Sequence, residues 1–402
     1  TTLCPPLTTL AHHCSPPPSP ARSFNWAVMG NLTFDPARFP DPKAMVDTLM
    51  NSKVQATRLM VSTWPFSQGA SKTYAPLAEK GFAVFNGSSG RGNTDAINWP
   101  DSVCGSPCHL YDPTNPEARK WWWANLKEGY YDYGIELYWL DAAEPEQLNG
   151  PPAGSAMSIG SFERDGMLFP KYHTQTYHEG LVASGSPDGI MLSRSAWAGM
   201  QTNRAILWNG DTYSTYAYLE KAVYAVQNIQ LSAIAWWTTD IGGYQGGKPG
   251  NAGFRELIVR WFQFGVVCPI FRQHGLRSTE PWLLGTAAFA SVRKVMAMRE
   301  TFRPYVEGEL AETAKSGLPL NRPLFYDFPS DPNVWGSSST DQFSFGRKYM
   351  AAPIYVAGAM SREVYFPQGC DWVHYFSQMK YSGGTTASVN GTIDEWPLFS
   401  RA

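Results

Sequence analysis

The chain has 402 residues, a length typical of two or three domains or of one large barrel with an appended domain. It carries 32 Lys and Arg against 34 Asp and Glu, and this balance excludes the basic surface on which nucleic-acid binding depends. Apolar residues make up 43% and charged residues 16%, which is too apolar for disorder, yet no unbroken apolar run reaches the roughly 18 residues of a membrane span.

Aromatic residues are the unusual feature of the composition. They make up 14% of the chain, and flat amphipathic rings in this quantity suit a surface that stacks on sugars. A well-filled core is the alternative explanation.

The N-terminal segment 1–22 is rich in Pro and Ser, and we expect it to be a flexible tail. It lacks the charged start and the apolar stretch of a signal peptide. Three glycosylation triplets, at Asn31, Asn86 and Asn390, are compatible with a secreted or endomembrane protein, but such triplets are common by chance. The sequence therefore leaves both the compartment and the oligomeric state open.

A segment rich in Gly, Ser and Asn over 66–110 is too long for an ordinary connection, so we expect an inserted subdomain or a lid. It contains Cys104 and Cys108, whose spacing allows a small disulfide bond. A metal pair is the weaker alternative, since His109 is the one histidine nearby and no second close cysteine pair exists.

Six short apolar runs, each ending in polar or charged residues, predict parallel strands alternating with helices. They are ATRLMVSTWP, IELYWLD, IMLSRS, AILWNGD, AIAWWTTD and VVCPIFRQHG. Stretches of helical length between several of them can serve as crossovers. This pattern predicts an α/β fold over 23–348, a (β/α)8 TIM-type barrel.

A long helical stretch, TAAFASVRKVMAMRETFRPYV, follows the last predicted strand. From about residue 349 the pattern changes to short alternating segments, so we expect a partial, small all-β domain over 349–402.

The polar residues at the predicted strand ends are suited to catalysis. In a closed barrel these ends meet at one mouth, where Asp141, Arg194, Asp211, Asp240, Arg272 and His274 would gather. Two carboxylates at one mouth are sufficient for glycoside hydrolysis, one acting on the anomeric carbon and the other on the leaving oxygen. Taken singly, Asp141 or Asp211 is also a common helix N-cap.

The segments WLDAAEPE, LSRSAWAG, WNGD, WWTTDIGGY and FRQHG stand in the order and spacing of glycoside hydrolase family 31, and the sequence resembles that family over more than four fifths of the chain. The resemblance implies a retaining α-glycosidase with Asp141 as nucleophile and Asp211 as acid/base. It further implies a set of substrate-binding residues, and no cofactor or metal. The set comprises Arg194, Trp208, Trp237, Asp240, Arg272, His274, Trp139 and Glu144. A plain loop carboxylate is the alternative for Glu144, and a structural histidine for His274.

The residues after the nucleophile, DAAEPE, are more similar to the xyloglucan-type α-xylosidases of the family than to its α-glucosidases. We therefore expect hydrolysis of non-reducing terminal α-xylosyl residues of oligosaccharides, with an α-glucosidase or α-transglycosylase as alternatives.

The family's first two barrel strands have no match before FDPARFPDP, so we expect a barrel that is incomplete at its N-terminal end. A non-catalytic carbohydrate-binding protein or a truncated fragment therefore remains a further alternative.

Overall fold

The computed structural model describes residues 24–89, 95–99, 104–105, 107–146, 150–336 and 339–402. The tail that we expected over 1–22 lies outside these residues. Within the described part of the chain, no helix is both long and apolar enough to cross a membrane.

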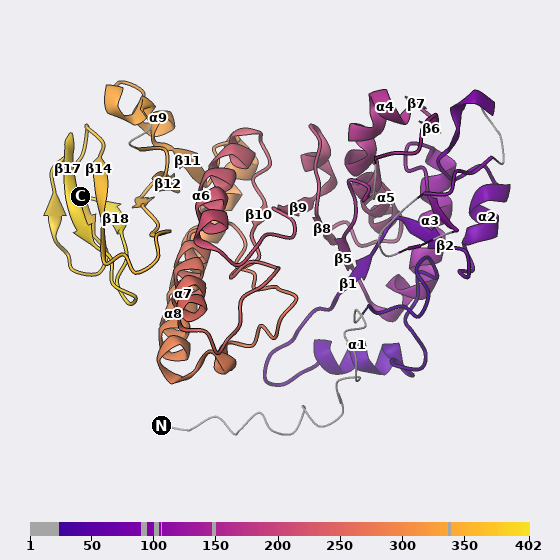
Figure 1. The fold of residues 1–402 in the computed structure, drawn as a ribbon, viewed down its shortest axis with the longest axis horizontal. Coiled ribbons are helices and arrows are strands. Elements are labelled where there is room, and N and C mark those ends of the chain that lie inside the picture. The colour runs from indigo at the N-terminus through magenta and orange to yellow at the C-terminus, as the bar shows by residue number, and fades with distance from the viewer. Residues whose placement is uncertain (1–23, 90–94, 100–103, 106, 147–149, 337–338) are drawn as a thin grey trace.

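A parallel sheet is the centre of the larger domain (Figure 1). Its five described strands follow one another in sheet order as they do in the chain: β1 (Met60–Thr63), β5 (Leu137–Leu140), β8 (Ile190–Ser193), β9 (Ala205–Trp208) and β10 (Trp237–Thr238). Thr63 pairs with Leu140, Leu140 with Ser193 and Ser193 with Leu207, so the carboxyl ends of the first four strands are level. The first five predicted strands and the barrel-type βα order are therefore confirmed.

Helices cover the sheet. The long ones are α3 (Pro116–Gly129), α5 (Phe169–Ala183), α6 (Tyr216–Leu231), α7 (Ala252–Val266) and α8 (Thr286–Ser316), and the short α1 (Pro42–Met50) precedes β1. Their starts carry local signals: Asn115 caps α3, Thr215 caps α6 and Asn251 caps α7, each accepting a backbone hydrogen bond. In Figure 1, α6, α7 and α8 lie between the parallel sheet and the C-terminal domain.

The sixth predicted strand, over 266–275, is wrong as a regular strand. Helix α7 continues to Val266, and the chain then makes only a single parallel bridge, between Gln273 and Ile241. Pro269 has no N–H to give to a ladder, which is one reason why regular pairing fails here. The backbone nevertheless runs beside β10, since the N–H of Ile270 donates to the carbonyl of Trp237 at 3.1 Å. The segment therefore still delivers its last residues to the edge where the strands end.

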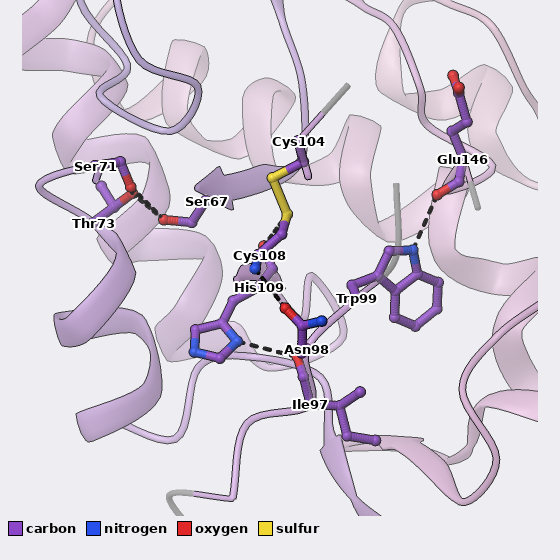
Figure 2. The surroundings of a disulfide bond; sticks show 10 residues. All are labelled: Ser67, Ser71, Thr73, Ile97, Asn98, Trp99, Cys104, Cys108, His109 and Glu146. Carbon is purple, nitrogen blue, oxygen red and sulfur yellow. Dashed lines mark hydrogen bonds between the residues drawn. A yellow bond between two sulfur atoms is a disulfide. The ribbon is translucent and has the colours of Figure 1, made fainter. Parts of the chain in front are cut away.

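The insertion after β1 forms a small subdomain. Its elements are β2 (Phe66–Gln68), α2 (Tyr74–Glu79), β3 (Phe85–Asn86) and β4 (Cys108–Leu110), joined by β6 (Ser155–Met157), β7 (Gly160–Ser161) and α4 (Phe162–Asp165) from the loop after β5. Strand β2 pairs with β4, and β3 pairs with β6. Cys104 and Cys108 form a disulfide bond next to β4, as the spacing suggested (Figure 2).

The C-terminal domain consists of two antiparallel sheets and the short helix α9 (Leu324–Asp327). One sheet has the order β11 (Asn321–Pro323), β12 (Phe343–Phe345), β13 (Tyr349–Ala351), β18 (Leu398–Arg401), β15 (Trp372–His374) and β16 (Lys380–Tyr381), and the other pairs β14 (Ser361–Phe366) with β17 (Thr385–Asn390). The first sheet therefore takes in residues on both sides of the boundary that we expected at 349.

The interface between the domains is built around Arg260 of α7. Its guanidinium is buried and donates to the carbonyls of Thr392, Ala359 and Gly391 at 2.8 to 2.9 Å. The C-terminal domain is thus fixed against the helix layer.

Candidate active site

Four charged residues follow four neighbouring strands of the parallel sheet. Asp141 comes directly after β5, Arg194 directly after β8, Asp211 three residues after β9 and Asp240 two residues after β10. Because the strands are parallel, their carboxyl ends share one edge. The sequence therefore folds so that these side chains lie together.

Arg194 holds the carboxylates of the loop after β5. Its Nη1 lies 3.1 Å from Asp141 Oδ1, and its Nε and Nη2 donate to the two carboxylate oxygens of Glu144 at 2.7 and 2.8 Å. Nη2 also donates to Glu146 Oε2 at 2.8 Å. Burial by itself would lower the pKa of Arg194, but the hydrogen bonds and charges of Glu144, followed by the charge of Asp141, raise it above the usual value. Arg194 therefore remains a cation that orients Asp141.

Asp141 is mostly buried, with 16% of its side chain exposed. Burial raises its pKa to about 6, and the charges of Asp211 and Glu144 act in the same direction. Arg194 and the backbone N–H of Ala142, which donates to Oδ1 at 2.9 Å, oppose that increase. The carboxylate is therefore ionised above about pH 6 and fixed in direction, as a nucleophile requires.

Asp211 is the more solvent-exposed of the two carboxyl groups. It follows Gly210, whose positive φ of 73° suits glycine and turns the chain after β9. Loss of hydration raises its pKa to about 6, and the charges of Asp240, Glu146 and Glu144 add to the increase, while Arg194 lowers it. Because the side chain is exposed, we expect a bound sugar that displaces water to raise this pKa further.

Asp240 is fully buried and accepts a hydrogen bond from Arg272 Nη1. Burial raises its pKa to about 6, although the charge and the hydrogen bond of Arg272 lower it. Its second oxygen, Oδ2, has no hydrogen-bond partner among the residues that the structure describes. A buried acceptor of this kind is satisfied when a ligand brings a hydroxyl group.

Two tryptophans pack against Arg272, the partner of Asp240. The rings of Trp139 and Trp208 lie 5.8 Å apart at 73°, and the Arg272 guanidinium lies 5.1 and 5.6 Å from their centroids. His274 packs edge-on against Trp139 at 4.7 Å. Burial, followed by the charges of Arg272 and Arg277, lowers the pKa of His274 to about 3, so its ring is neutral at ordinary pH.

Trp237 is the one predicted site residue that the structure places elsewhere. It pairs in register with Leu207, and its ring contacts Phe264 of α7 at 6.5 Å. Since side chains alternate across a strand, Trp237 faces the helix layer while Asp240, three residues later, faces the site. Trp208 is 1% exposed, so it supports Arg272 and Trp139 from inside the core.

Three further residues belong to the site although the sequence did not identify them. Glu146 bonds to Arg194, Tyr244 stacks on His274 at 5.3 Å, and Arg277 donates to the carbonyl of Gly243 at 2.7 Å. Burial lowers the pKa of Arg277 to about 10, with the charge of Asp240 opposing the decrease. The only sequence signal was proximity, since Glu146 and Arg277 each lie within three residues of a predicted site residue.

The described residues include no group of three or more His, Cys, Asp or Glu that could hold a metal ion. Carboxyl groups with raised pKa values, an unsatisfied buried acceptor and aromatic rings suit an uncharged, polyhydroxylated ligand.

Comparisons with known proteins agree with this arrangement. Residues 22–307 match the model of the glycosyl hydrolases family 31 TIM-barrel domain, and residues 317–402 match that of the family 31 C-terminal domain. An α-xylosidase from Saccharolobus solfataricus is 30% identical over 390 residues, which cover 94% of this chain and 50% of the relative. An α-glucosidase 2 from Bacillus thermoamyloliquefaciens is 29% identical, over 92% of this chain and 46% of the relative.

Solved structures of xylosidases also match this chain. A family 31 α-xylosidase from a soil metagenome, complexed with xylose, is 34% identical and has a TM-score of 0.87, covering 94% of this chain and 57% of that one. A xylosidase from Aspergillus niger is 26% identical, with a TM-score of 0.86, over 94% of this chain and 58% of that one. The chain spans about half the length of the curated relatives it matches.

Proposed function

The chain belongs to glycosyl hydrolase family 31, and from this premise we propose that it acts as a retaining α-glycosidase on non-reducing terminal α-xylosyl residues of oligosaccharides such as xyloglucan fragments. Asp141 is the nucleophile and Asp211 the acid/base in this proposal. The observation that carries it is the pairing of an oriented, Arg194-bound carboxylate with a second, exposed carboxyl group whose pKa is raised to about 6.

The reaction has two displacements. In the first, Asp141 attacks the anomeric carbon, the bond to the leaving oxygen breaks, and that oxygen takes the proton of Asp211. In the second, the Asp211 carboxylate takes a proton from water, the water oxygen attacks the anomeric carbon, and Asp141 leaves as a carboxylate. The two inversions restore the α configuration.

The remaining site residues would bind the sugar. Asp240 offers its unpartnered Oδ2 to a hydroxyl group of the glycone, and neutral His274 offers a ring nitrogen. Arg272 packs on the rings of Trp139 and Trp208 and pairs with Asp240. These contacts fix the direction of its other N–H groups, which can donate to the sugar. Glu144 orients Arg194 rather than the sugar.

The α-xylosyl specificity is supported by the DAAEPE segment and by the names of the Saccharolobus and soil-metagenome relatives. The α-glucosidase relative supports the second candidate, an α-glucosidase. An isomaltosyltransferase from Sporosarcina globispora is 26% identical over 90% of this chain. It supports a variant of both candidate activities in which the glycosyl group is transferred to a sugar hydroxyl instead of water. A hydroxymethyl group changes transition-state binding by about 1 to 3 kcal/mol, so kcat/KM values for xyloside and glucoside should differ by roughly 5- to 150-fold.

The test compares kcat/KM for matched aryl α-xyloside and α-glucoside substrates and follows the first-formed sugar by proton NMR. We expect the xyloside to be preferred and α-xylose to appear first. In the same assay, Asp211→Ala tests the acid/base role. Its control is Asp188→Ala, at an exposed side chain paired with Arg204. Preference for the glucoside selects the second candidate. Binding of the sugars without turnover by the folded chain contradicts the proposal.

A further inference from the structure

The insertion after β1 reaches the catalytic cluster through Trp99. This side chain is fully buried and packs against Phe162 with ring centroids 4.9 Å apart. Its indole Nε1 donates to the backbone carbonyl of Glu146 at 3.0 Å (Figure 2). A residue of the insertion thereby fixes a residue of the loop that follows Asp141.

The position of Trp99 is itself fixed beside β4 and the disulfide bond. The backbone N–H of Trp99 donates to the carbonyl of Cys108 at 2.7 Å, and the N–H of Cys108 donates to Asn98 Oδ1 at 2.7 Å. Cys108 is bonded to Cys104, and both sulfur-bearing residues are buried. Figure 2 shows the disulfide, Asn98 and Trp99 side by side, with Trp99 pointing toward Glu146.

Glu146 continues this chain of contacts to the nucleophile. Its backbone N–H donates to the carbonyl of Ala142 at 3.1 Å, which closes the turn directly after Asp141. Its carboxylate accepts from Arg194 Nη2 at 2.8 Å, and Arg194 Nη1 lies 3.1 Å from Asp141. The carbonyl held by Trp99 and the carboxylate held by Arg194 thus belong to the same residue.

We propose that Trp99 and Glu146 are positioning residues for Asp141 and Asp211, and that the disulfide-linked insertion acts on the reaction through the Trp99 indole N–H. The kinetic consequences of this inference rest on the proposed function. The placement of the Glu146 carboxylate by Trp99 does not depend on turnover.

The charges around Asp211 give the proposal a specific readout. Asp240, Glu146, Glu144 and Asp141 face Asp211 as carboxylates, and Arg194 faces it as a cation. If the Glu146 carboxylate moves away, Asp211 loses a negative neighbour and Arg194 is freed to act on the remaining carboxylates. Both changes favour the ionised form of Asp211.

The experiment measures the protonation midpoint of the Asp211 carboxyl group by infrared titration of the folded chain, with the band assigned by its loss in Asp211→Asn. The variants are Trp99→Phe, which keeps a ring but removes the donor, and Glu146→Ala. We expect both to lower the midpoint by roughly half a pH unit. Trp123→Phe is the matched control, because Trp123 donates an equivalent indole hydrogen bond to Ser184 at 3.1 Å outside the site.

The kinetic arm uses the same variants. We expect Trp99→Phe to lower kcat roughly 2- to 10-fold, the effect of one lost hydrogen bond, and to move the alkaline limb of the pH profile to lower pH. The effects of Trp99→Phe and Glu146→Ala should be less than multiplicative in the double variant, because both act through Glu146.

The outcomes separate the two proposals. An unchanged midpoint in Trp99→Phe overturns the role of the insertion, whatever the activity, because Glu146→Ala lowers the midpoint through the loss of a carboxylate alone. A lowered midpoint in a chain that hydrolyses no α-glycoside supports the positioning role and contradicts the proposed function. If Trp99→Phe does not fold, Asn98→Ala is the second variant, because it removes the acceptor of the Cys108 N–H beside Trp99, and an unchanged midpoint in it overturns the role of the insertion.

Discussion

Replacing Arg194 with Met should shift the acidic limb of the pH profile, because Arg194 is the cation that keeps Asp141 ionised. The pKa of Asp141 is raised to about 6 even with Arg194 3.1 Å away. Arg194→Met removes that cation and leaves the negative charges of Glu144 and Asp211 acting on Asp141. The pKa of Asp141 must therefore increase.

The size of the effect follows from the ionised fraction. An opposite charge at this distance lowers a carboxyl pKa by roughly 1 to 3 units. A rise from about 6 to roughly 7 to 9 reduces the ionised fraction at pH 6 from one half to between about one eleventh and one thousandth, which is roughly a 5- to 500-fold decrease. We expect kcat/KM at pH 6 to fall by at least this factor, and the loss to shrink as the pH increases.

The assay is the pH dependence of kcat/KM on an aryl α-xyloside, which reports the ionisations of the free protein. Arg194→Lys should move the acidic limb less than Arg194→Met, since it keeps the charge but loses the bidentate contact. Arg204→Met is the control, because Arg204 pairs with the exposed Asp188 at 2.6 Å outside the cluster. A uniform loss of activity with an unmoved acidic limb would refute the reasoning.

Three other predictions concern single residues. Asp211→Ala should reduce turnover of substrates with poor leaving groups roughly 100- to 10,000-fold but turnover of glycosyl fluorides far less, and equal losses would contradict an acid role. Asp240→Asn should lower kcat/KM by roughly 13- to 150-fold, as for a lost hydrogen bond to a charged group, and an unchanged value would remove Asp240 from sugar binding. Arg322→Met should lower the unfolding free energy by about 1 to 3 kcal/mol, because Arg322 is 1% exposed and its loss takes the donors from the buried carbonyls of Pro319 and Gly346, while Asp327 keeps Arg401 at 3.0 Å; a denaturant titration showing no change would contradict this.

Most of the fold could be predicted from the sequence, because parallel strands that are buried on both faces consist of short apolar runs. Asp141, Arg194, Asp211 and Asp240 were predictable for the same reason, since each follows such a run. The run at 266–275 was misleading because its apolar residues end α7 and continue past it, so composition alone could not separate a helix end from a strand.

Side-chain direction and loop contacts were not predictable. Trp237 was expected to bind substrate, but it begins β10 and the register points it toward Phe264 of α7. Trp99 bonds to a residue 47 positions away, and this contact exists only because two loops pack together. Neither fact is visible in local sequence patterns, because both depend on tertiary packing.

The most direct measurement is to trap the covalent intermediate. The chain is incubated with 5-fluoro-α-xylosyl fluoride and with its α-glucosyl counterpart, and the labelled peptide is mapped by mass spectrometry. The account predicts an ester on Asp141, formed faster with the xylosyl reagent, and no label in Asp141→Ala. A label on another residue, or none in folded protein that turns over an α-glycoside, would contradict Asp141 as the nucleophile.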